Sequence, residues 1–131
     1  MIDREKNPEF VNSFLDYSIT ILNKSTNSIK EYNYDLTMFF RYMMIHFNLT
    51  DEKEFNEIEI KNFSIEDIKR IKLEDIHAFI SYLAVYNKSK SATRARKIST
   101  IRIFFNYLAC KANLIETNPA QNLETPKREK R

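Results

Sequence analysis

Residues 91–108 read SATRARKISTIRIFFNYL, and this stretch joins two patterns within one predicted helix. Its second half repeats apolar residues at spacings of three and four, as a helix with one buried face requires. These apolar positions are Ile98, Ile101, Phe105 and Leu108. The first half crowds positive charge, and the basic positions of the helix are Arg94, Arg96, Lys97 and Arg102. Why a core helix carries this charge at its start is the main question for the function of this chain.

A helical projection separates the two patterns. The apolar positions cluster within about 80° of one another. Arg96 and Thr100 fall on the opposite side, and Lys97 and Arg102 flank the apolar stripe. We interpret the first turns of this helix as projecting beyond the core, with their charges and hydroxyls on one outer surface. A helix start of this kind suits phosphate groups and the major groove of DNA.

The composition favours an all-α fold. The chain has 131 residues, which is about one domain, and 43% of them are hydrophobic. Glycine is absent, which excludes a glycine-rich phosphate loop, a dinucleotide fingerprint and Asn-Gly or Asp-Gly hairpins. The sequence contains no apolar run long enough for a membrane span and no secretory signal. The lone cysteine, Cys110, fits a reducing compartment, so we expect a cytoplasmic protein.

Charge is distributed unevenly along the chain. Residues 1–50 hold five basic and six acidic side chains, and residues 51–86 hold five and nine. Residues 87–131 hold eleven basic and three acidic side chains, so most of the positive charge lies in the last third. This asymmetry points to a polyanionic partner for that part of the chain, although charged faces can also serve only solubility.

Two helices are predicted in the first half. The first spans residues 8–23, with Asn7 as its cap and Pro8 in its first turn. Its apolar face consists of Phe10, Val11, Phe14, Leu15, Ile19 and Leu22. The second spans residues 26–47 and starts either near Ser25 or at Ser28. Its apolar stripe consists of Ile29, Tyr32, Leu36, Phe39, Phe40, Met43 and Phe47.

The second half continues the helical pattern after an acidic loop. We predict that loop over residues 48–63, a short helix over 64–71, a third long helix over 73–86 and a turn over 87–92. The fourth long helix spans residues 91–113. Asn118 and Pro119 end regular structure or start one last short turn.

No catalytic or metal-binding constellation is present in the sequence. His46 and His77 lie far apart and lack the cysteine and histidine spacing of a zinc site, so we expect no metal and no cofactor. The tyrosines lie in or beside apolar stripes, which is typical of packing residues, and we assign no nucleophile among them. The adjacent acidic pairs at residues 66–67 and 74–75 diverge around a helix and suit its first turn, as the helix dipole favours.

Two segments resemble a known family. STNSIKEYNYDLTMFFRYM (25–43) resembles the second helix of the N-terminal core-binding domain of tyrosine recombinases and phage integrases. SATRARKISTIRIFFNYL is similar to the fourth helix of that domain. The matching positions are Ser25, Ser28, Tyr32, Asp35, Leu36, Phe39, Thr93, Arg96, Ile98, Ser99, Arg102, Phe104, Phe105, Tyr107 and Leu108. The exit segments Asn118-Pro119-Ala120 and Thr125-Pro126-Lys127 also match. The acidic 48–72 segment is longer than in many relatives.

The resemblance, which covers residues 8–127 and is closest to Xer-like enzymes, implies an architecture. We expect an all-α, four-helix SAM-like bundle with an extra short helix or loop between the second and third helices. Residues 1–115 would form the core-binding domain, and residues 116–131 a basic linker toward a catalytic domain that this chain lacks. This chain would therefore clamp duplex recombination-site DNA but cut nothing, and family members assemble as tetramers on DNA. No small-molecule substrate is implied.

The predicted DNA contacts come from three places. The expected residues are Lys24, Ser25, Asn27, Ser28 and Lys30 in the second helix, Lys90, Ser91, Thr93, Arg94, Arg96, Lys97 and Arg102 in the fourth, and Lys127 and Arg128 in the linker. Plain helix capping is the other explanation for Ser25 and Ser28. The alternative function is a helical protein-interaction module whose basic face docks an acidic partner.

Overall fold

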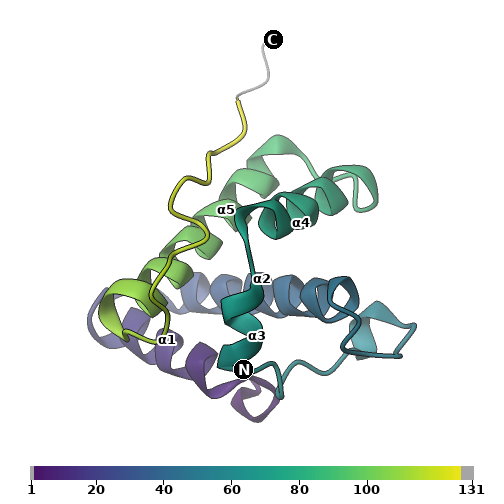
Figure 1. Ribbon diagram of the computed structural model, residues 1–131. Helices are drawn as coiled ribbons and strands as arrows, with labels where there is room; N and C mark the ends of the chain where they lie inside the picture. The colour runs from purple at the N-terminus through teal and green to yellow at the C-terminus, as the bar shows by residue number, and fades with distance from the viewer. Residues whose placement is uncertain (1, 128–131) are drawn as a thin grey trace. The chain divides into compact units, whose positions relative to one another are not determined.

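The structure is a computed structural model and describes residues 2–127. Within that range the chain contains helices and turns but no strand, so the all-α prediction is confirmed. The α-helices are α1 (Glu9–Thr20), α2 (Thr26–His46), α3 (Ile65–Arg70), α4 (Leu73–Val85) and α5 (Ser91–Asn106) (Figure 1). Two short 3-10 turns, η1 (Arg4–Lys6) and η2 (Phe55–Glu57), and a π-helical turn, η3 (Tyr107–Lys111), complete the elements. The extra short helix is α3, as expected.

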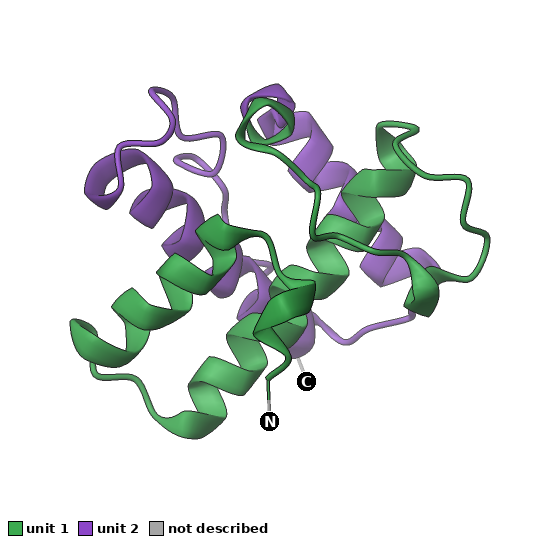
Figure 2. Cartoon of the chain, turned by 90° about the horizontal axis from the view of Figure 1, so that it is seen from below, with its two compact units in different colours: residues 1–68 green, residues 69–131 purple. Residues whose placement is uncertain are grey.

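The chain divides into two compact units, which are coloured separately in Figure 2. The N-terminal unit is Met1–Ile68 and contains α1, α2 and the first part of α3, whose last two residues, Lys69 and Arg70, fall in the other unit. The C-terminal unit is Lys69–Arg131 and contains α4, α5 and η3. The predicted division at residues 115 and 116 stays a prediction. Among residues 2–127, no helix combines the length and the apolar character needed to cross a membrane.

Aromatic rings form the core of the N-terminal unit. Phe40 on α2 is fully buried, and its ring centroid lies 5.8 Å from that of Phe10 and 5.3 Å from that of Phe39. A third ring, that of Phe63, lies 4.9 Å from Phe40 and belongs to the segment between η2 and α3. The rings of Phe10 and Phe39 meet that of Phe40 edge to face, and such pairs add to the stabilisation from burial. The irregular segment 58–63 is therefore part of the core, although it has no regular structure.

Two predicted helix starts are confirmed by their caps. The Ser25 hydroxyl accepts a hydrogen bond from the Ser28 backbone N–H at 3.1 Å, and α2 begins at the next residue, Thr26. Before α3, the Ser64 hydroxyl accepts from the Asp67 N–H at 3.1 Å, while the Asp67 carboxylate accepts from the Ser64 N–H at 2.9 Å. Such reciprocal capping satisfies two backbone donors at a helix start.

Asn7 does not cap α1, which corrects the prediction. The residue before α1 is Pro8, and no side-chain hydrogen bond caps the helix there. Asn7 is 3% exposed, and its side-chain amide donates to the Oδ1 atoms of Asn12 at 3.1 Å and Asn33 at 2.7 Å. A buried amide needs hydrogen-bond partners, so the three asparagines satisfy one another and link the start of α1 to α2.

The predicted apolar face of α1 is wrong at its C-terminal end. Ile19 and Leu22 are 45% and 36% exposed, and Ile21 is 67% exposed. The helix ends at Thr20, so Leu22 lies outside it, and Ser18 occupies the centre of the buried face with no exposed surface. A regular apolar spacing predicts the buried face only as far as the helix itself continues.

Asparagine takes the role that glycine has at most helix ends. Among residues 2–127, a positive φ is found at Asn23, Asn48, Lys88 and Asn113, with values between 50° and 56°. Each follows a helical segment, and the next backbone N–H returns to a carbonyl in its last turn. The Leu49 N–H, for example, donates to the Met44 carbonyl at 2.8 Å. Asparagine tolerates this left-handed conformation better than other non-glycine residues, which explains how a chain without glycine ends its helices.

Asn48→Ala is expected to lower the free energy of unfolding by about 1 kcal/mol, because alanine pays the steric cost of the left-handed region. Asn48→Gly should leave stability unchanged or raise it slightly. Urea unfolding followed by circular dichroism measures both. Asn62→Ala, at an exposed position without positive φ, is the control. Equal stability for the Asn48→Ala and Asn48→Gly variants would contradict this assignment.

In the C-terminal unit, α4 and α5 pack together and are joined by a short loop over residues 86–90. The buried side chains of α4 are Ile76, Phe79 and Leu83. The chain then continues as η3 to Lys111, close to the predicted end at residue 113. Beyond it, Ala120 and Leu123 are 2% and 3% exposed, and a short turn places the Leu123 N–H 3.1 Å from the Ala120 carbonyl. The first part of the predicted linker is thus packed.

Candidate nucleic-acid interface

The buried face of α5 differs from the predicted one. Thr100 is only 2% exposed, so the prediction that it points outward is wrong. Lys97 is 4% exposed and lies within the buried face, not at its edge. The buried residues of the helix are Lys97, Ile98, Thr100, Ile101, Phe104 and Phe105. Phe104, which was not counted in the predicted apolar stripe, is fully buried. The centre of the observed buried face therefore lies closer to Thr100 and Lys97 than the centre of the predicted stripe.

The hydroxyl of Thr100 explains how a polar residue is accommodated there. It donates to the Arg96 carbonyl one turn earlier, at 3.4 Å. A threonine hydroxyl that bonds back to its own helix no longer needs water. The helical projection placed Thr100 on the outer face because threonine is polar. The hydrogen bond to its own helix allows Thr100 to be buried instead, so that prediction was wrong.

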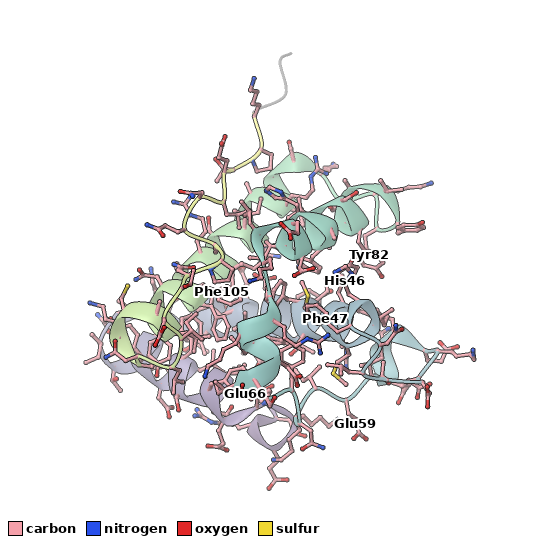
Figure 3. All side chains as sticks on the ribbon, viewed as in Figure 1. His46, Phe47, Glu59, Glu66, Tyr82 and Phe105 are labelled. Atoms are coloured by element: carbon pink, nitrogen blue, oxygen red, sulfur yellow. The ribbon has the colours of Figure 1, made fainter. Side chains whose placement is uncertain are left out.

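The outer face of α5 is lined by small and polar side chains. Its exposed residues are Ala92, Ser99, Arg102 and Asn106. Arg102 is therefore the basic residue of α5 that stands most clearly in solvent, while Arg94 and Arg96 are half-buried. Phe105 of the same helix, labelled in Figure 3, is fully buried.

Arg94 connects the start of α5 to the loop before it. Its guanidinium Nη1 donates to the Ser89 backbone carbonyl. Both the Ser89 N–H and its hydroxyl donate to the Leu83 carbonyl of α4, each at 3.0 Å. One N–H group of the Arg94 guanidinium therefore binds the loop. These hydrogen bonds give the loop a defined conformation and fix the positions of its basic residues.

The entrance of α5 carries further exposed charge. Lys88 and Lys90 are both exposed, and Ser91 and Thr93 are half-buried. No side-chain hydrogen bond caps the helix at Lys90, in contrast to the Ser25 cap of α2. Lys88 was not among the predicted contacts, although Lys90 and Ser91 of the same turn were. Its position next to Lys90 in a basic segment was the signal that could have identified it.

The sequence around this entrance contains no acid. Residues 76–115 include no aspartate or glutamate, while they include seven lysines and arginines. The last acids before this stretch, Glu74 and Asp75, lie in the first turn of α4, at the end of that helix remote from the loop. The positive potential at the α4–α5 loop is therefore not offset by acids of the same segment.

The start of α2 forms a second, separate basic segment in the N-terminal unit. Lys24, Asn27 and Lys30 are exposed. The Ser25 hydroxyl caps the helix and also donates to the Ser28 hydroxyl at 3.1 Å. Helix capping accounts for these two serines, so the lysines and Asn27 are the groups of this segment that remain most open to a ligand.

The remaining predicted contacts are at the C-terminal end. Lys127 is exposed, and Arg128 lies outside the described residues. Within residues 2–127, no group of three or more His, Cys, Asp or Glu side chains is arranged to hold a metal ion.

A surface hollow of about 550 Å³ lies in the N-terminal unit, where α2 faces η1 and the segment after η2. Its lining mixes acidic with basic side chains, among them Glu5, Glu57, Arg41 and Lys61. The Arg41 Nε atom donates to the Ile58 carbonyl at 3.1 Å, and the Lys61 Nζ atom to the Glu5 carbonyl at 2.8 Å. The first bond holds the segment against α2 and the second holds it against η1, and the mixed charge does not extend the basic surface.

The fold and the basic entrance of α5 define an all-helical, SAM-like domain. Residues 58–111, from the end of the acidic loop through η3, match the family described as Phage integrase, N-terminal SAM-like domain. The chain is thus similar to the N-terminal domain of the tyrosine recombinase and phage integrase family.

Individual relatives show the same similarity. The chain is 38% identical over 123 residues to Tyrosine recombinase XerC of Caldanaerobacter subterraneus subsp. tengcongensis, covering 93% of this chain and 35% of the relative. It is 31% identical over 119 residues to Tyrosine recombinase XerC of two Leptospira interrogans serovars, copenhageni and Lai, covering 91% of this chain and 32% of each. The chain thus spans about one third of the length of the curated relatives it matches. No solved structure matches the chain.

Proposed function

We propose that this chain binds duplex DNA as the N-terminal, non-catalytic domain of a tyrosine-type site-specific recombinase. The observation that carries the proposal is a set of exposed basic residues, Lys88 and Lys90 at the entrance of α5 and Arg102 further along the same helix, within a segment free of acids. The α2 start, with Lys24 and Lys30, supplies a second set of phosphate contacts. Lysine and arginine side chains at helix starts are common phosphate ligands and fix the register of a protein on the duplex.

The similarity to this family supports the same function. The relatives are named as tyrosine recombinases, and a recombinase acts on DNA. The catalytic residues of the whole protein would lie outside this chain. A cytoplasmic location and assembly with other protomers on DNA are further expectations. The exposed apolar residues Ile19, Ile21 and Leu22 at the end of α1 suit such a protein contact.

Fluorescence anisotropy with a labelled 30-base-pair duplex over a salt series tests the proposal. If about six to eight phosphates are neutralised, log affinity should fall with log salt at a slope of roughly −5 to −7. Polyglutamate of comparable charge is the control, because the alternative function is docking to an acidic protein. A slope near zero with DNA, together with tighter binding to polyglutamate, would contradict DNA binding and favour the interaction module.

A further inference from the structure

The end of α4 exposes an aromatic and apolar surface next to the basic loop. Tyr86 is 77% exposed and Val85 is 60% exposed. Tyr82, labelled in Figure 3, lies one turn earlier, and its ring centroid is 5.7 Å from that of Tyr86 at an interplanar angle of 30°. These three residues, which we name the α4 aromatic patch, are not needed for the core of α4, which is formed by Ile76, Phe79 and Leu83.

The surroundings of the patch are positively charged. Lys88 and Lys90 follow Tyr86 within four residues, and both are exposed. The bonds of Ser89 to Leu83 fix the loop that carries these lysines to the last turns of α4, so the patch and the lysines keep a constant relation. Residues 76–115 contain no acid, so no side chain of this segment repels a polyanion.

We propose that the α4 aromatic patch packs on the sugar–phosphate backbone of the duplex beside the phosphates held by Lys88 and Lys90. The inference rests on the proposed function and adds a non-ionic contact to it. A tyrosine ring covers the apolar face of a deoxyribose, and its hydroxyl donates to a phosphate oxygen. A duplex backbone offers both groups side by side, which matches a surface of two tyrosines, one valine and two lysines.

The two kinds of contact differ in their response to salt. Lysine contacts release counterions, so their loss reduces the salt slope. Contacts of the aromatic patch bury apolar surface and release no counterions, so their loss lowers affinity equally at every salt concentration. This difference gives the inference a signature that neither the lysines nor a general change in charge can reproduce.

The experiment measures the duplex affinity of a Val85→Ser/Tyr86→Ser variant across the same salt series. We expect a loss of about tenfold at each salt concentration with an unchanged slope. Tyr34→Ser is the matched control, because Tyr34 is a 61% exposed tyrosine on α2 with Glu31 and Asp35 nearby in sequence, and its affinity should not change. Circular dichroism confirms that each variant is folded.

A second measurement uses the absence of tryptophan from the chain. Tyr86→Trp places a single tryptophan in the patch, and its quenching by acrylamide should decrease when the duplex is added. Tyr34→Trp is the control and should show equal quenching with and without the duplex.

The outcomes separate the inference from the proposed function. Unchanged affinity of the Val85→Ser/Tyr86→Ser variant and unchanged acrylamide quenching of Tyr86→Trp, with a steep slope for the parent chain, would overturn only the inference. If sedimentation showed that the parent chain self-associates and the Val85→Ser/Tyr86→Ser variant does not, while the variant keeps its DNA affinity, the inference would also be overturned. The patch would then be a contact with a second copy of the chain. If the parent chain showed no salt-dependent DNA binding, the proposed function would be contradicted, and the inference that rests on it as well.

Discussion

Phe40→Ala is expected to lower the free energy of unfolding by about 3–5 kcal/mol, the usual cost of removing a fully buried phenylalanine. Phe40 has no exposed surface, and its ring lies within 6 Å, centroid to centroid, of the rings of Phe10, Phe39 and Phe63. Domains of this size are stable by about 5–15 kcal/mol, so this one substitution removes a large part of the total. Urea unfolding followed by circular dichroism measures the change.

The cavity left by Phe40→Ala has a specific consequence for the acidic loop. Phe63 belongs to the segment between η2 and α3, and its ring lies closest to Phe40 among the three ring neighbours. Loss of this contact should raise hydrogen exchange at Ile58 and Ile60, whose buried side chains fix the same segment. Phe40→Leu keeps part of the volume and provides a folded variant if the alanine variant does not fold.

Tyr34→Ala is the matched control for this prediction. Tyr34 lies on the same helix and is 61% exposed, so its replacement should change stability by less than about 0.5 kcal/mol. A cost below about 1 kcal/mol for Phe40→Ala would contradict the assignment of this ring as the centre of the core of the N-terminal unit.

The sequence was sufficient to predict the helices, because their apolar periodicity and their caps agree. Ser25 and Ser64 each precede a helix with a hydrogen-bond partner three residues later, so two signals place each start. The acidic loop was also predicted, although its core residues were not. The acidic loop has no apolar periodicity, yet three of its side chains are buried, those of Ile58, Ile60 and Phe63. Tertiary contacts determine this burial, so the sequence pattern could not predict it.

The errors have a common physical cause. Polar residues that find hydrogen-bond partners inside the protein do not behave as their residue type suggests: Thr100 bonds to its own helix, and Asn7 bonds to Asn12 and to Asn33 on α2. Lys97 was predicted at the edge of the apolar stripe because the helical projection places it just beside Leu108 and Ile101. Projection on a wheel gives the direction of a side chain, but the width of the buried face depends on what packs against it.

The burial of Lys97 changes which charges of the C-terminal unit are expected to contact phosphate. Each lysine or arginine that neutralises one phosphate contributes about 0.9 to the salt slope. Lys88, Lys90 and Arg102 are exposed and can approach a duplex, whereas Lys97 is 4% exposed. The four residues carry the same formal charge, so burial alone distinguishes them.

A Lys88→Gln/Lys90→Gln/Arg102→Gln variant is therefore expected to have a salt slope flatter by about 3 and a duplex affinity at 0.1 M salt lower by roughly 10²- to 10³-fold. Lys97→Gln should leave the slope unchanged, whatever it does to stability. Anisotropy over the salt series, with circular dichroism at each temperature used, measures both variants. If Lys97→Gln flattened the slope by about 1 while the triple variant kept it, the buried lysine would have to reach phosphate when DNA binds, and the three exposed residues would not be the DNA contact.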